Sequence, residues 1–139
     1  MIFKYGAYPK PDSVSEFIYR PTIEIVFKYK EEFILVDALI DSGADFTILP
    51  AEMAEALHMP LDKKTKTEFL GAGGNKFIVC QSADKIEYII RQTGFRSLRW
   101  ESKVYFGDGQ PTILLGQTGF LNRFRVTLDG PRRQIEINQ

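Results

Sequence analysis

The chain has 139 residues, with 18 Lys and Arg against 18 Asp and Glu. This length suits one domain with a modest core, and the balanced charge favours neither nucleic acid nor a membrane surface as a partner. The single cysteine, Cys80, excludes an internal disulfide, and residues 1–10 lack the basic-then-apolar layout of a signal peptide, so we expect a cytoplasmic location. No apolar stretch approaches the roughly 20 residues that a membrane span requires.

The first segment, residues 1–21, carries Pro9, Pro11 and Pro21 among scattered aromatic residues, which predicts an extended N-terminal arm. Residues 22–139 then form one domain. Its first two strands are predicted at Thr22–Tyr29, where apolar and charged residues alternate, and at Phe33–Ile40. The charged residues between them indicate an antiparallel hairpin.

A short helix of about two turns is predicted at Ala51–Leu57, which is rich in helix formers and follows Pro50. Residues 117–123 are predicted to form a short helical turn. From Thr65 onward strand signals dominate, separated by turns that each contain Gly. The predicted strands are Thr67–Leu70, Phe77–Cys80, Lys85–Arg91, Ser97–Phe106, Thr112–Leu115, Phe124–Leu128 and Gln134–Ile137. The fold class is therefore all-β, with one or two short helices and a small closed or barrel-like sheet.

The segment most typical of a functional site is Asp41-Ser42-Gly43-Ala44. It forms a tight turn between the apolar runs Phe33–Ile40 and Phe46–Leu49. A turn after a buried strand places its polar groups at an edge or in a cleft. Asp, Ser and Gly are also ordinary turn formers, so the turn alone does not indicate a function.

The whole stretch from Ala38 to Pro50 resembles the active-site segment of retropepsin-like aspartic proteases, in which an apolar strand, Asp-Thr/Ser-Gly-Ala, a second Asp and another apolar strand follow in order. Ile113-Leu114-Leu115-Gly116 resembles the second signature of that family, an apolar run that crosses behind the catalytic loop. Leu70–Phe77, which contains Gly71-Ala72-Gly73-Gly74, looks like the flap hairpin. These segments stand in the family's order, so the resemblance implies a retropepsin-like fold.

Aspartic proteolysis requires two carboxylates that share one proton, because one takes a proton from water while the other polarises the scissile carbonyl. Asp-Ser/Thr-Gly occurs only once in this chain. The resemblance therefore implies a two-fold homodimer in which Asp41 of each copy forms the dyad. Ser42 would then hold the two loops in register, and Gly43 would let a backbone amide approach the carboxylate. The dyad would titrate as a unit, with activity in mildly acidic to neutral conditions.

Asp45 matches the family position that contacts the substrate backbone and is held by an Arg just after the Gly of the second signature. Here Gly116 is followed by Gln117-Thr118-Gly119, so that Arg is absent. Arg123 or Arg125 could take its place. Asp45 is thus either a substrate contact, together with Ala44, or part of a structural salt bridge.

The flap residues Gly71, Ala72, Gly73 and Gly74 would close over a polypeptide substrate and supply backbone hydrogen bonds, or they form only an exposed turn. No phosphate-binding motif follows them. With one His and one Cys in the chain, no metal site or cofactor is expected.

Two functions remain open at this stage. The first is an aspartic endopeptidase, active as a homodimer on polypeptides, with Asp41, Ser42 and Gly43 as catalytic residues and Leu114, Leu115 and Gly116 as structural support. The alternative is an inactive dimerisation or peptide-binding module with the same fold, which the missing Arg after Gly116 favours.

Overall fold

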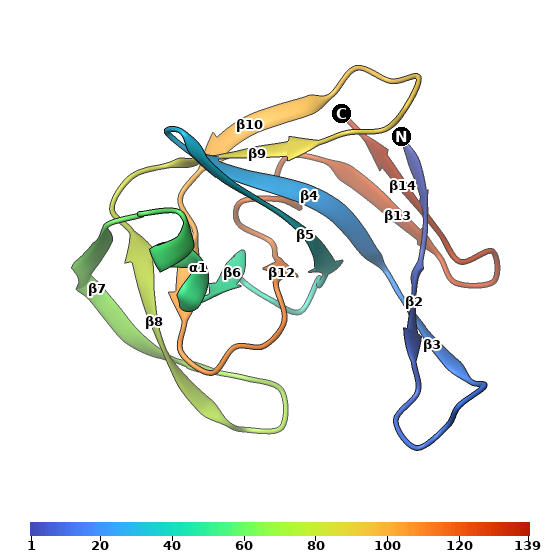
Figure 1. Cartoon of the computed structure of the whole chain (residues 1–139), viewed down its shortest axis with the longest axis horizontal. Coiled ribbons are helices and arrows are strands. Elements are labelled where there is room, and N and C mark those ends of the chain that lie inside the picture. The colour runs from blue at the N-terminus through green and yellow to red at the C-terminus, as the bar shows by residue number, and fades with distance from the viewer.

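The computed structural model describes residues 1–139 and consists almost entirely of strands, which confirms the predicted mainly β fold. A nine-stranded sheet forms the body of the molecule and curls around the core (Figure 1). The order across this sheet is β10 (Leu98–Ser102), β9 (Ile86–Ile90), β4 (Thr22–Tyr29), β5 (Glu32–Ile40), β12 (Leu114–Leu115), β6 (Ile48–Pro50), β11 (Tyr105–Gly107), β8 (Lys76–Ser82) and β7 (Leu61–Leu70). Because β10 and β7 are each paired on one side only, this curled sheet is a half-barrel, as in the predicted retropepsin-like fold.

The predicted hairpin of β4 and β5 is confirmed, with Thr22 paired to Leu39 and Tyr29 paired to Glu32. The start of β4 therefore lies beside the end of β5. The alternating apolar residues of β4 point into a core of 21 buried residues, where Phe27 packs edge-to-face on Tyr88 with ring centroids 5.0 Å apart. Trp100 packs in the same core, as expected for a large apolar side chain.

The predicted helix is present as α1 (Glu52–Ala56), directly after β6. Residues 117–123 form hydrogen-bonded turns and no regular helix; the Leu121 N–H, for example, donates to the Gly116 carbonyl at 3.0 Å. No helix in the chain is long and apolar enough to span a membrane.

The predicted strand Ser97–Phe106 is divided into β10 and β11. Val104 lies between them, and its N–H donates to the Ser82 hydroxyl at 3.2 Å. As a result β10 pairs only with β9, whereas β11 pairs with β8 and β6 on the other side of the sheet. The two halves of this segment therefore join opposite parts of the half-barrel.

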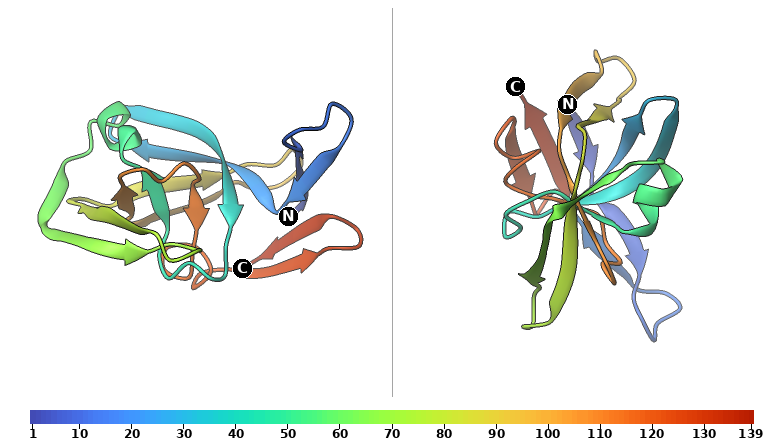
Figure 2. Two further views of the ribbon diagram at one scale, coloured as in Figure 1. Left: turned by 90° about the horizontal axis from the view of Figure 1, so that it is seen from below. Right: turned by 90° about the vertical axis from the view of Figure 1, so that its left-hand side faces the viewer.

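The two ends of the chain form a separate three-stranded sheet, in the order β1 (Ile2–Lys4), β14 (Gln134–Asn138) and β13 (Arg125–Asp129). Between β1 and β4 the chain forms a hairpin of β2 (Gly6–Pro9) and β3 (Phe17–Arg20). This hairpin stands away from the body in Figures 1 and 2. Residues 1–21, expected as an extended arm, thus contain three short strands, and their separation from the domain stays a prediction.

Candidate active site

The turn that carries Asp41 begins where β5 ends. The Asp41 N–H donates to the Leu115 carbonyl at 3.1 Å, so the backbone of this residue is tied to β12. The Gly43 N–H donates to Asp41 Oδ1 at 2.9 Å, and the Ala44 N–H donates to the Asp41 carbonyl at 3.2 Å. Two backbone amides of the turn therefore bond to Asp41 itself, and its half-buried side chain is held in a defined orientation.

The second predicted signature, β12, lies between the strands on either side of this turn. Leu115 pairs in parallel with Ile40, the last residue before Asp41, and Leu114 pairs antiparallel with Ile48 in β6. Gly116 then passes so close to the turn that a Cβ on it would lie 2.4 Å from the Phe46 carbonyl oxygen. Only glycine fits there, because no heavy-atom contact that short is tolerated.

The residues after Gly116 hold the same turn. The Gln117 N–H donates to the Ala44 carbonyl at 2.8 Å, and its side-chain Nε2 donates to the Ser42 carbonyl at 2.9 Å. The buried Thr47 hydroxyl donates to the Thr118 carbonyl at 3.3 Å and accepts from the Gly116 N–H at 3.4 Å. Sequence reasoning missed both side chains. Thr47 was detectable as a hydroxyl within an apolar run, but nothing local indicated the bond of Gln117.

Asp45 is exposed, and none of the ion pairs in the structure includes its carboxylate. The expected replacement of the family Arg is not found, because Arg123 donates instead to the Glu101 carbonyl at 3.2 Å. Arg125 lies in β13, in the sheet of the chain termini, and makes no ion pair. The support that an Arg would give to Asp45 is thus absent, and Gln117 supports the neighbouring Ser42 backbone instead.

A cleft of about 1070 Å³ opens beside Asp41. Its floor is the turn itself, with Asp41 and residues 43–46. One wall is the hairpin of β7 and β8, and another is the segment 108–112 between β11 and β12. A cleft with one carboxylate on its floor and strands along its side can accept an extended chain.

Three aromatic rings line the side of this cleft that lies below the hairpin. Phe46 stacks on Phe69 with ring centroids 5.5 Å apart, and Phe69 packs edge-to-face on Phe77 at 6.2 Å. Tyr105 supports them from behind, 4.9 Å from Phe46. The rings therefore join β7 and β8 to the turn that follows Asp41.

The predicted flap is the turn between β7 and β8. The Gly71 N–H donates to the Asn75 carbonyl at 2.7 Å, which closes the hairpin. Gly73 and Gly74 have φ angles of +84° and +82° and no atom within 4 Å of a Cβ position. The tip is thus exposed and built from conformations that side chains disfavour.

The structure brings several predicted site residues together along the cleft. Asp41, Gly43, Ala44, Asp45, Gly71, Ala72 and Leu114 line it. Ser42, Gly73 and Gly74 are exposed outside it, whereas Leu115 and Gly116 are buried behind it. The Ser42 hydroxyl makes no hydrogen bond within the chain.

Behind the turn lies Tyr88, a fully buried side chain whose hydroxyl has no hydrogen-bond partner. Burial raises the pKa of Tyr88 well above its ordinary value of 10.0, because the charged phenolate would lose its hydration. Tyr88 therefore stays neutral in the core and takes no part in acid–base chemistry.

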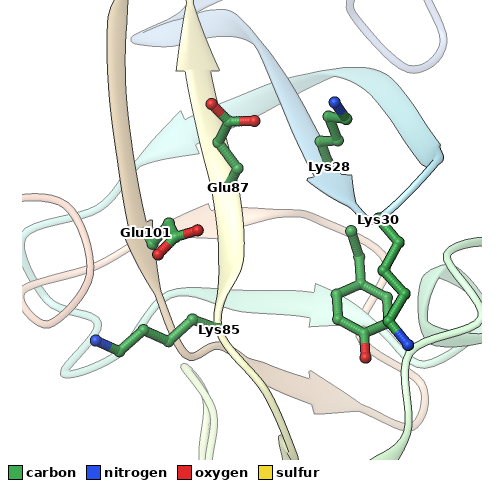
Figure 3. Close-up of a pocket in the computed structure, with 6 residues that line it drawn as sticks. Lys28, Lys30, Lys85, Glu87 and Glu101 are labelled. Carbon is green, nitrogen blue, oxygen red and sulfur yellow. The ribbon is translucent and has the colours of Figure 1, made fainter.

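A smaller hollow of about 280 Å³ lies on another part of the surface, around the ends of β4, β9 and β10 (Figure 3). It is lined by Lys28, Lys30, Lys85, Glu87 and Glu101 besides Tyr29 and shares no residue with the cleft. Its lysines and glutamates carry opposite charges and include no nucleophile–base pair. No group of three or more His, Cys, Asp or Glu side chains is placed to hold a metal ion.

Comparison with known proteins agrees with this geometry. A family model described as aspartyl protease matches residues 34–118, which include the Asp41 turn, the hairpin and Gly116. The fold is similar to the retroviral protease-like domain of Ddi1 from Leishmania major, with a TM-score of 0.52 and 16% identity over 85% of this chain and 89% of that one. It also matches the EIAV protease complexed with the inhibitor HBY-793, with a TM-score of 0.44 and 19% identity over 75% of this chain and 85% of that one. A search of curated proteins found no match.

Proposed function

Because this chain belongs to the aspartyl protease family, we propose that it is an endopeptidase whose active site is shared by two copies of the chain. The observation that carries the proposal is the Asp41 carboxylate on the floor of a cleft beneath a glycine-tipped hairpin. The retropepsin-like fold that the sequence predicted is in place around it.

The need for a second copy follows from the chemistry. Peptide hydrolysis at a carboxylate dyad requires one ionised and one protonated acid, and the chain has a single Asp-Ser-Gly. A two-fold axis beside the turn would pair Asp41 with its equivalent in the second copy. The exposed Ser42, whose hydroxyl has no partner within the chain, is suited to bond across that axis.

In the proposed mechanism, a water molecule lies between the two Asp41 carboxyl groups. The ionised group accepts a proton from this water as the oxygen attacks the scissile carbonyl carbon, while the protonated group donates to the carbonyl oxygen. The bond from the Gly43 N–H stabilises the ionised form of Asp41, whereas the like charge of the partner opposes double ionisation. One proton is therefore shared by the pair.

The substrate that fits this cleft is an extended polypeptide. The outer part of the β7–β8 hairpin, residues 68–72 and 75–77, lines the cleft and would add the substrate as a further strand. The half-buried rings of Phe46, Phe69 and Phe77 offer an apolar surface to one or more of its side chains. Large apolar residues near the scissile bond are thus the preferred class. The single Cys80 suits a reducing compartment, and we propose that the enzyme works in the cytoplasm.

The test is cleavage of a proteome-derived peptide library between about pH 4 and 7 by wild type, Asp41→Asn and Asp37→Asn, with and without an aspartic-protease transition-state inhibitor. Asp37 is an exposed acid on β5, the strand that leads to Asp41, and lies outside the cleft, so its variant controls for the lost charge. We expect Asp41→Asn to remove cleavage and Asp37→Asn to retain it. Equal proteolysis by wild type and Asp41→Asn would rule out the enzyme.

One observation favours a second candidate, a peptide-binding or dimerisation module with the same fold. Asp45 has no basic partner, so the support given by an Arg in the family is missing. If dimeric wild type binds library peptides but cleaves none of them, the module is the correct description.

A further inference from the structure

The hairpin of β2 and β3, residues 6–20, is the one element that takes no part in the buried core. Its strands pair only with each other, and both of its outer edges are free. Figures 1 and 2 show that it extends beyond the body of the molecule. A two-stranded hairpin of this kind is marginally stable in water unless something packs on it.

This hairpin is nevertheless held in a definite shape. At its tip, the Lys10 N–H donates to the Glu16 carbonyl at 2.9 Å, and the two side chains form a salt bridge at 2.9 Å. At its root, the Tyr8 hydroxyl donates to Thr22 Oγ1 at 2.8 Å. The Arg133 guanidinium stacks on the Tyr19 ring at 3.5 Å. The hairpin therefore projects as a preformed arm.

Apolar side chains are exposed on both faces of the arm, with Phe17 and Tyr19 on one face of β3 and Ile18 on the other. Phe17 is 54% exposed and Val14 is fully exposed, while Ile18 and Tyr19 are also open to solvent. Soluble monomers seldom leave such neighbouring apolar side chains uncovered on a projecting element. A protein surface is therefore expected to cover them.

The position of the arm identifies that surface. β4 runs antiparallel to β5, with Thr22 opposite Leu39, so residues before Thr22 lie beyond the end of β5 that carries Asp41. Pro21, directly after the arm, accepts a hydrogen bond from the Ile40 N–H at 3.0 Å. If the two-fold axis passes beside Asp41, the arm extends on the side of the molecule where the other copy lies.

We propose that the β2–β3 arm of each copy packs on the second copy of the chain, with Phe17 and its apolar neighbours buried in the contact. The proposal rests on the proposed function, because that function places the axis beside Asp41. Each arm would add contacts around the catalytic turns without contributing a reacting group. The arm is then an assembly element through which the shared site is stabilised.

The first test is sedimentation equilibrium of wild type, Phe17→Ser and Phe33→Ser. Phe33 is 66% exposed and lies at the opposite end of β5, seven residues from Ile40 and thus roughly 23 Å away along the strand. We expect Phe17→Ser to raise the dimer dissociation constant at least about tenfold, or about 1.4 kcal/mol, and Phe33→Ser to leave it unchanged. A Phe17→Ser protein that dimerises as tightly as wild type would overturn the inference.

The second test places the photo-crosslinker benzoylphenylalanine at position 17 in an equal mixture of ¹⁵N-labelled and unlabelled protein. We expect crosslinked peptides that combine both labels, and none from the same crosslinker at position 33. Crosslinks confined to one label, from a protein shown to be dimeric, would place the arm on its own chain and refute the proposal. A wild type that stays monomeric at every concentration would refute the shared active site as well, so the two failures are distinguishable.

Discussion

At the scale of single residues, substitution of Asp45 distinguishes a structural role of its carboxylate from a role in substrate binding. Its carboxylate makes no ion pair, so Asp45→Asn removes no intramolecular interaction. We expect the free energy of unfolding to change by no more than about 0.5 kcal/mol. If Asp45 contacts the substrate backbone from the cleft floor, KM for peptide cleavage rises while kcat changes little. Urea denaturation and steady-state kinetics measure the two effects, and a large loss of stability with unchanged KM would contradict this role.

Tyr88 gives the chain a specific response to alkaline pH. Because burial raises the pKa of Tyr88, the unfolded chain loses this proton near pH 10 while the folded chain keeps it. The contribution to stability is thus complete below pH 10 and falls as pH rises above it, by up to about 1.4 kcal/mol per pH unit. Urea denaturation at pH 8, 10 and 11 should show that the free energy of unfolding decreases less with pH for Tyr88→Phe than for wild type.

The control for this prediction is Tyr19→Phe, which changes an exposed tyrosine of the arm. Its free energy of unfolding should decrease with pH as steeply as that of wild type. At pH 8, Tyr88→Phe should be as stable as wild type or slightly more stable, since the lost hydroxyl has no hydrogen-bond partner. A slope equal to that of wild type in Tyr88→Phe would show that this proton does not govern alkaline stability.

Individual site residues were predictable where the signal is local. Asp41 and Gly43 lie in one turn, so their spacing alone brings the amide to the carboxylate. Gln117 contacts Ser42 across 75 positions of sequence, and no local pattern indicates that bond. Arg123 was a reasonable candidate partner for Asp45 by charge, but the turns at 117–123 direct it toward Glu101.

At the scale of elements, the crossing of β12 behind the Asp41 turn depends on Gly116. Gly116→Ala would place a Cβ 2.4 Å from the Phe46 carbonyl oxygen and 2.6 Å from that of Ala44. Both are backbone atoms, so β12 or the turn must move, and we expect a loss of about 3 kcal/mol in the free energy of unfolding. Gly130→Ala is the matched control, because nothing lies within 4 Å of its Cβ position, and it should change stability by less than about 0.5 kcal/mol. Equal urea midpoints for the two variants would disprove the close approach.

Strands with a clear alternation of apolar residues were predictable almost to the residue, as for β4. The division of residues 97–106 was not, since it depends on Ser82 bonding to Val104 from another strand. The prolines at the start of the chain concealed the β2–β3 hairpin. Pro9 is the last residue of β2, Pro11 lies in the turn and Pro21 follows β3, so none of them interrupts the pairing. Local pattern therefore specified the strands that face the core and failed where long-range pairing decides the structure.

At the scale of the whole molecule, the roles that we propose for the arm and for the active site both require the same homodimer. A carboxylate dyad with one member from each copy is inactive in any dimer that contains one Asp41→Asn chain. This property distinguishes the shared site from a monomeric enzyme, because a monomer would not respond to the presence of an inactive copy.

The measurement is peptide cleavage by a fixed amount of wild type that has exchanged subunits with increasing Asp41→Asn protein. Random pairing predicts that an equal amount of the variant lowers activity to about one half, and a tenfold excess lowers it about tenfold. Asp37→Asn added in the same excess should not lower activity, because its dimers retain both Asp41 groups. Activity that stays constant as Asp41→Asn is added, under conditions where labelled subunits are seen to exchange, would show that a single copy of Asp41 suffices.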